Sequence, residues 1–126
     1  MIPKFRAWHT PFKGKKFGQE MKYGRAGTLL SFAEMSPDDY ILMQSTGLKD
    51  KNGVEIYEGD IVKVTNHPFQ KKEDSAGIEI DGDYLIGWSD HNLTWLAGDL
   101  LLYQLKPYIE VIGNIYENPE LLEAIE

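Results

Sequence analysis

The stretch from Thr46 to Val64, TGLKDKNGVEIYEGDIVKV, constrains the fold more than any other part of the chain. Asn52-Gly53 is typical of a tight type I′ turn, in which two successive residues need positive φ. Glu58-Gly59 predicts a second chain reversal, and the β-branched residues that follow it, from Asp60 to Thr65, favour a strand. Two reversals around short strands indicate a β architecture.

Other segments are also typical of short strands. Residues 4–8 alternate charged and apolar side chains, which places Phe5 and Ala7 on one face and Arg6 and Trp8 on the other. Asp81-Gly82 predicts the turn of a hairpin between residues 78–80 and 83–88. Residues 99–105 fit either a buried helical turn or a strand. Further strands are predicted over residues 21–23, 28–32, 40–44, 93–97 and 108–113.

The C-terminal segment predicts a short helix over residues 117–125. Asn118 suits the N-cap, Pro119 suits the first helical position, and Glu120 places negative charge at the positive end of the helix dipole. A helix this short needs a surface for its apolar stripe of Leu121, Leu122 and Ile125. We therefore expect one mainly β domain over residues 1–126, built as a small curved sheet or SH3-like barrel with a short C-terminal helix.

The charges are divided unevenly along the chain. Residues 1–25 hold seven cations and one acid, a charge of +6, so the overall charge of −7 leaves −13 on the remainder. Opposite charges of this kind favour contact between the two parts, within one subunit or between copies, although solvated faces would look the same in sequence. The chain has no cysteine and no apolar run of membrane length, so we expect a soluble, cytoplasmic protein with no membrane contact.

No residue pattern typical of a catalytic or metal site is present in the sequence. The three histidines, His9, His67 and His91, lie in separate predicted loops without metal-ligand spacing. Glu55, Glu58 and Asp60 form an acidic cluster, which either serves a cation or proton or protects an exposed hairpin edge; the edge interpretation is favoured. We therefore expect a protein with no catalytic residue, metal or cofactor.

Four segments resemble the YopX family of small phage and prophage proteins. They are IPKFRAW, TGLKDKNG, IYEGDIVKV and VIGNIYENPELLE, in the order that the family has, and they span nearly the whole chain. Two departures are His9, where the family usually has an acid, and the unusually basic loop from Pro11 to Gly18. The resemblance implies a phage or prophage origin, and hence the cytoplasm of a bacterial host, but it assigns no catalytic residue.

These observations predict a non-enzymatic protein-binding or assembly module that can self-associate, with an unidentified protein partner. The predicted interface sets basic loop residues against an acidic and apolar tail: Lys13, Lys15 and Lys16 against Glu120, Glu123 and Glu126, with Leu121 and Leu122 as anchors. The alternative is a nucleic-acid-binding protein, which the acidic remainder opposes. Its residues would be Trp8, Lys13, Lys15, Lys16, Lys22, Tyr23 and Arg25.

Overall fold

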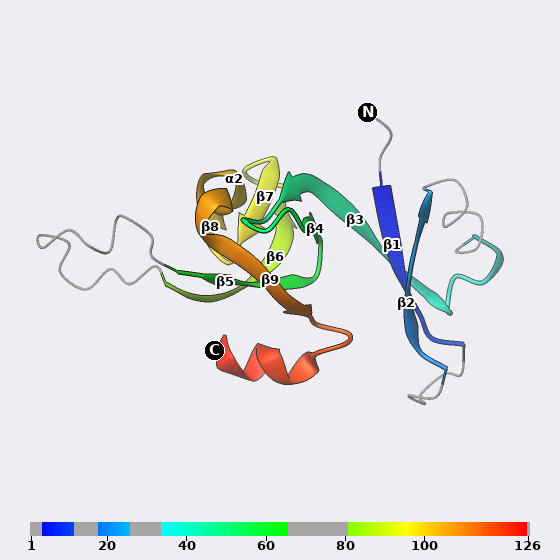
Figure 1. The fold of residues 1–126 in the computed structure, drawn as a ribbon. Coiled ribbons are helices and arrows are strands. Elements are labelled where there is room, and N and C mark those ends of the chain that lie inside the picture. Colours follow the sequence, from blue (N-terminus) through cyan, green and yellow to red (C-terminus); the bar gives the residue numbers. More distant parts are fainter. Residues whose placement is uncertain (1–3, 12–17, 26–33, 66–80, 126) are drawn as a thin grey trace, which may run out of the picture.

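The computed structural model describes residues 4–11, 18–25, 34–65 and 81–125, and the chain is mainly β, as predicted (Figure 1). The strands are β1 (Lys4–His9), β2 (Glu20–Arg25), β3 (Tyr40–Lys49), β4 (Glu55–Tyr57), β5 (Asp60–Val64), β6 (Gly82–Ser89), β7 (Thr94–Ala97), β8 (Leu100–Leu101) and β9 (Ile109–Asn114). The helical segments are α2 (Leu102–Leu105) and the 3-10 helices η2 (Lys106–Tyr108) and η3 (Pro119–Ala124). None of the described helices is long and apolar enough to cross a membrane.

The strands form two antiparallel sheets that share a junction. One has the order β2-β1-β3-β4 and the other the order β8-β7-β6-β5-β9. The long strand β3 serves both parts of the molecule, because its first half pairs with β1 and its second half with β4. Figure 1 shows the consequence: β1 and β2 stand to one side, while β4 to β9 curl strongly into a half-barrel. The predicted strand over residues 28–32 lies outside the described residues.

The hydrophobic core lies inside the half-barrel. Its buried members come from strands and from α2: Ile56, Val62, Val64, Ile86, Ala97, Leu102, Leu105 and Ile109. Burial of each large aliphatic side chain contributes roughly 1.5–3 kcal/mol. The segment 99–105, for which the sequence allowed a strand or a helical turn, contains both. Leu100 and Leu101 form β8, and the next four residues form α2. Leu102 and Leu105 lie one helical turn apart and are both buried.

The turn at Asn52-Gly53 joins β3 to β4, but it is not the type I′ turn predicted. Only Gly53, at φ +82°, has positive φ within it. Its N–H donates to the carbonyl of Asp50 at 3.0 Å, and the buried Asp50 carboxylate accepts the N–H groups of Asn52 and Val54 at 2.8 and 2.9 Å. Such Asx contacts favour an ordinary turn closed by one left-handed glycine. The second Asp50 oxygen accepts the Val111 N–H at 2.9 Å and ties this turn to β9.

Two other local predictions need correction. Gly82 is the first residue of β6, opposite Val64, so Asp81-Gly82 does not form a two-residue turn; residues 78–80 lie outside the described part of the chain.

At the C-terminus, Pro119 opens a 3-10 helix as its position predicts, but Asn118 makes no side-chain cap. Its Oδ1 instead accepts the N–H of Asn114 at 3.3 Å, because the segment folds back against the end of β9.

Candidate functional site

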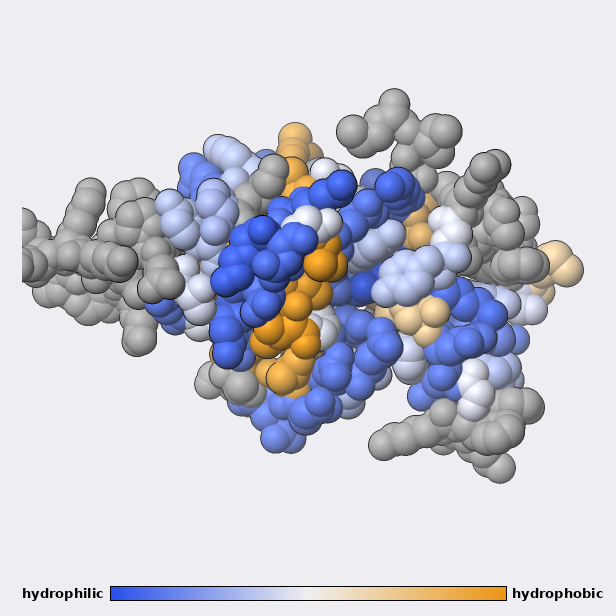
Figure 2. Space-filling model, in the orientation of Figure 1, coloured by the Kyte–Doolittle hydropathy of each residue, from blue (hydrophilic) through white to orange (hydrophobic). Residues whose placement is uncertain are grey.

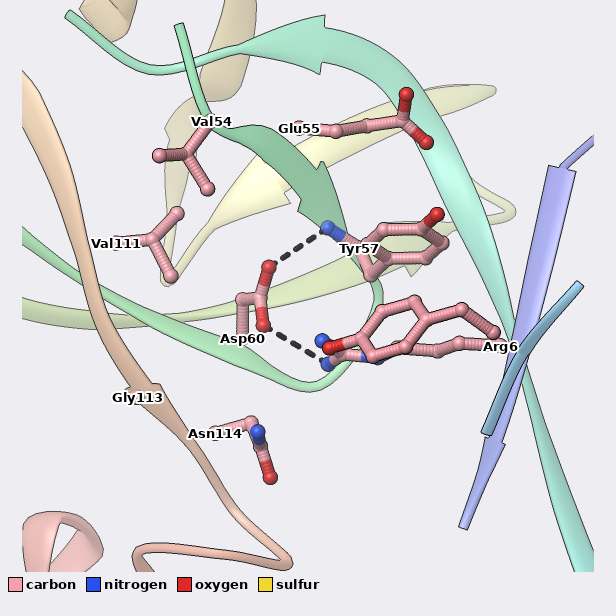
Figure 3. Close-up of a pocket in the computed structure, with 9 residues that line it drawn as sticks. Arg6, Val54, Glu55, Tyr57, Asp60, Val111, Gly113 and Asn114 are labelled. Carbon is pink, nitrogen blue, oxygen red and sulfur yellow. Dashed lines mark hydrogen bonds and ion pairs between the residues drawn. The ribbon is translucent and has the colours of Figure 1, made fainter. Parts of the chain in front are cut away.

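A cleft of about 340 Å³ opens where the two sheets meet, between the edge strands β4 and β9 (Figure 3). It is lined by Arg6 and Tyr23 from the first sheet, Val54, Glu55 and Tyr57 at β4, Asp60 of β5, and Val111, Gly113 and Asn114 of β9. The turn that Asp50 ties to β9 holds the two walls together at one end.

A buried ion pair joins the two sheets at this cleft. Arg6 Nη2 lies 2.8 Å from Asp60 Oδ1, and the two side chains are 3% and 2% exposed. The same nitrogen donates to the carbonyl of Glu58 at 3.2 Å, and the guanidinium lies 4.8 Å from the centre of the Tyr57 ring. The other Asp60 oxygen accepts the Tyr57 N–H at 2.8 Å. Arg6 therefore contacts three neighbouring residues at the turn between β4 and β5 at once.

The face of β1 that carries Arg6 also carries Trp8, as the alternation predicted. Trp8 is buried and stacks on Tyr116, with ring centres 5.8 Å apart. This face is therefore turned toward the second sheet. Gly59, at φ +88°, allows the turn between β4 and β5 to approach Met43 of β3 closely. An added Cβ at this position would lie 3.2 Å from Met43 Sδ.

The titratable groups of the cleft are tuned mainly by burial and by one another. Burial raises the pKa of Asp60, and Arg6 offsets part of that shift. Burial and the neighbouring Glu55 raise the pKa of Tyr57 to about 12, so this phenol is neutral at physiological pH. Partial burial acts to raise the pKa of Glu55, but hydrogen bonds with Ser45 and Tyr57 and the contact with Lys4 lower it below its ordinary value. Glu55 is therefore an anion balanced by Lys4 at 3.2 Å.

The acidic cluster predicted from Glu55, Glu58 and Asp60 does not converge on one point. Glu55 and Asp60 line the cleft, whereas Glu58 lines a second one of about 400 Å³ on the other side of the junction. The interpretation of Asp60 as part of an exposed edge was wrong, because Arg6 buries it. Within the described residues, no set of three histidine or acidic side chains is placed to hold a metal ion.

The predicted interface residues fall partly on η3. Glu120, Leu122 and Glu123 are exposed there. Leu121 is half-buried against β9, since an added Cβ at Gly113 would lie 2.8 Å from its Cδ1. The helix thus docks on its own sheet, beside the wall of the cleft to which Gly113 belongs. Lys13, Lys15, Lys16 and Glu126 lie outside the described residues.

Among the residues predicted to bind nucleic acid, the three whose side chains the structure describes, Trp8, Lys22 and Tyr23, are not gathered on one face. Trp8 is buried against Tyr116, so its ring is not available to stack on a base. Lys22 contacts Glu20 at 2.8 Å. Tyr23 is 61% exposed and meets Tyr57 edge-on, with ring centres 5.8 Å apart. Arg25 ends β2, and the three lysines of the basic loop are not among the described residues.

Sequence analysis missed most of the cleft. Arg6, Tyr57 and Val111 come from strands far apart in the chain, and no local pattern connects them. One signal was available: Arg6 shares a face with Trp8, and a charged residue beside a large apolar one on a predicted buried face indicates a buried partner of opposite charge. The sequence does not say which of the chain's many acids that partner is.

Comparison with known proteins gives matches over nearly the full length of the chain. The family model described as YopX protein matches residues 4–123. The crystal structure of protein EF1440 from Enterococcus faecalis is similar at 33% sequence identity and a TM-score of 0.54, over 97% of this chain and 99% of that chain. No curated protein shows a significant match.

Proposed function

The chain belongs to the YopX family, and from this membership and the cleft between β4 and β9 we propose that it is a phage-derived, non-enzymatic protein-binding module of the bacterial cytoplasm. The partner binds across the cleft. The resemblance noted in the sequence supports the phage origin, and the geometry of the cleft supports the mode of action.

The observation that carries this proposal is the exposure of apolar and aromatic side chains at the mouth of the cleft. Val54 is 49% exposed, although valine is usually buried, and Tyr23 is 61% exposed, a residue type enriched at interfaces. Figure 2 shows a band of hydrophobic residues down the middle of this face, bordered by hydrophilic ones. An apolar centre with a polar rim is the usual composition of a protein interface.

The charged groups in the cleft support binding rather than catalysis. Arg6 and Asp60 are engaged with each other, and Glu55 is balanced by Lys4. Tyr57, with its pKa raised to about 12 by burial and by Glu55, is a neutral hydrogen-bond donor and not a base at neutral pH. Of these contacts, the pair of Arg6 and Asp60 holds the two sheets together.

A comparative pull-down tests the proposal. Tagged protein is used to capture partners from prophage-induced cells, with and without nuclease, as wild type, as Val54→Arg and as Leu93→Arg. Leu93 is 74% exposed and does not line the cleft, so it is a matched control for an added surface charge. We expect a nuclease-resistant partner that Val54→Arg loses and Leu93→Arg keeps.

Capture that nuclease abolishes would favour the alternative, a nucleic-acid-binding protein. That alternative has less support, because Trp8 is buried and the acidic Glu117, Glu120 and Glu123 are exposed on the C-terminal segment that packs against β9. A measured turnover of any metabolite would contradict the non-enzymatic assignment.

A further inference from the structure

We infer that the occupant of the cleft is a second copy of this chain, whose basic segment, residues 12–17, docks on the acidic surface that η3 and the turn before it form beside the cleft. This inference rests on the proposed function and names its partner. The two features that carry it are the acidic surface beside the β9 wall and the apolar lining between β4 and β9.

The wall formed by β9 continues into a strongly acidic surface. Residues 109–126 contain five glutamates and no lysine, arginine or histidine. Glu117, Glu120 and Glu123 are exposed, on η3 and on the turn before it. Because Leu121 seats η3 on Gly113, this negative surface lies directly beside the cleft. A ligand that enters the cleft along this side therefore meets negative charge.

The inside of the cleft selects for apolar groups rather than for a second charge. Arg6 and Asp60 neutralise each other at 2.8 Å, and Lys4 balances Glu55 at 3.2 Å. Val54 and Val111 point toward each other across the opening (Figure 3). The structure thus favours a ligand with an apolar or aromatic anchor and with cations on either side of it.

Residues 12–17 of the chain, FKGKKF, have this chemistry. They hold three lysines and two phenylalanines without an acid, a charge of +3. In their own subunit they belong to the connection between β1 and β2. In this hairpin Arg6 pairs with Tyr23, and three further residue pairs extend to His9 and Glu20. The pair of His9 and Glu20 therefore lies about 10 Å along the hairpin from Arg6, at about 3.3 Å per strand residue. A reciprocal exchange between two copies would form a two-fold symmetric dimer.

Analytical ultracentrifugation of the full chain at low and high salt tests the inference. We expect a dimer that salt dissociates, because its rim contacts are exposed ion pairs. Replacing Lys13, Lys15 and Lys16 together by Gln should weaken dimerisation about tenfold, as should Val54→Arg. The matched controls are the triple Gln replacement of the exposed Lys49, Lys51 and Lys63, which changes the net charge equally, and Leu93→Arg; both should dimerise like wild type.

A synthetic peptide of residues 10–19 provides a second measurement that does not depend on the folding of any variant. It should compete with dimer formation, and a peptide with Gln at the three lysines should not. A chain that is monomeric at every concentration and salt, or a dimer that neither the lysine nor the Val54 variant weakens, overturns the inference. If the chain is monomeric but a foreign partner is lost on Val54→Arg, the proposed function stands alone; if no capture depends on Val54, both fail.

Discussion

At the residue scale, the contact between Arg6 and Asp60 is the strongest single constraint on how the two sheets meet. Removing one partner would leave an unpaired charge in a site that is almost fully buried, which costs about 3–5 kcal/mol. We expect Arg6→Met to lower the free energy of unfolding by this amount. The double variant Arg6→Met/Asp60→Leu should recover part of the loss, because it removes both charges. Urea denaturation measures the free energy of unfolding of wild type, the single variant and the double variant.

The matched control for this pair is Lys4, on the same strand. Its ion pair with Glu55 is exposed, with the Lys4 side chain 66% accessible. Exposed pairs contribute about 0–1 kcal/mol, so Lys4→Met should change the free energy of unfolding by less than about 1 kcal/mol. If Arg6→Met costs no more than Lys4→Met, the buried pair does not couple the sheets.

Tyr57 predicts a specific dependence of stability on alkaline pH. Burial, with a further contribution from Glu55, raises its pKa in the folded protein to about 12, above the value near 10 of an unfolded chain. Between these values the folded protein binds more protons than the unfolded one, so stability falls as pH rises. The contribution of Tyr57 is complete below about pH 10 and is lost through about pH 12.

Denaturation of wild type and Tyr57→Phe over this alkaline range checks the prediction. The stability advantage of wild type over the variant should shrink as the pH rises, because the phenyl ring of the variant cannot ionise. Identical slopes for the two proteins would mean that the phenol titrates normally in the folded state.

Single residues also show where sequence reasoning succeeds and fails. The alternation in β1 placed Arg6 and Trp8 on one face, and this was confirmed. The interpretation of Asp60 as part of an exposed hairpin edge, which was made from its acidic neighbours, was wrong. Alternation reports which side chains share a face, but the element that covers that face comes from elsewhere in the chain. Arg6 and Asp60 are brought together only by the junction of the sheets.

At the scale of elements, the docking of η3 depends on the absence of a side chain at Gly113. An added Cβ would lie 2.5 Å from Asn118 Oδ1 and 2.8 Å from Leu121 Cδ1. Gly113→Ala should therefore displace η3 and destabilise the protein by about 1–3 kcal/mol, as overpacking does. Gly87→Ala is the matched control, since nothing lies within 4 Å of its added Cβ in β6. Hydrogen–deuterium exchange should increase over residues 114–125 in the first variant only.

Element positions were easier to predict than the contacts at element ends. The strands at residues 40–44 and 108–113 follow from local β propensity and were confirmed within a few residues. The type I′ turn and the Asn118 cap were wrong for a common reason. Asp50 and Asn118 both hydrogen-bond to β9, so a distant strand decides the local geometry. Local sequence does not contain that strand.

At the scale of the whole molecule, the cleft exists because the long strand β3 carries the first sheet from β1 and β2 across to β4. Its two halves pair with β1 and with β4, so the first sheet is continuous with one wall of the half-barrel, while β9 forms the opposite wall. Sequence patterns supply strands but not their order in a sheet. This explains why the mainly β class was predicted while the cleft between β4 and β9 was not.

The buried contacts at the junction of the sheets also predict how the molecule unfolds. Arg6 with Asp60 and Trp8 with Tyr116 are interactions that neither sheet keeps without the other. Small domains coupled in this way unfold in one cooperative transition. In the variant Trp88→Phe/Trp95→Phe, fluorescence reports only on Trp8, which lies in the first sheet, while far-ultraviolet circular dichroism reports on all strands. The two urea curves should coincide. A fluorescence transition at lower urea would show instead that β1 and β2 detach before the half-barrel unfolds, and that the cleft can open without loss of the core.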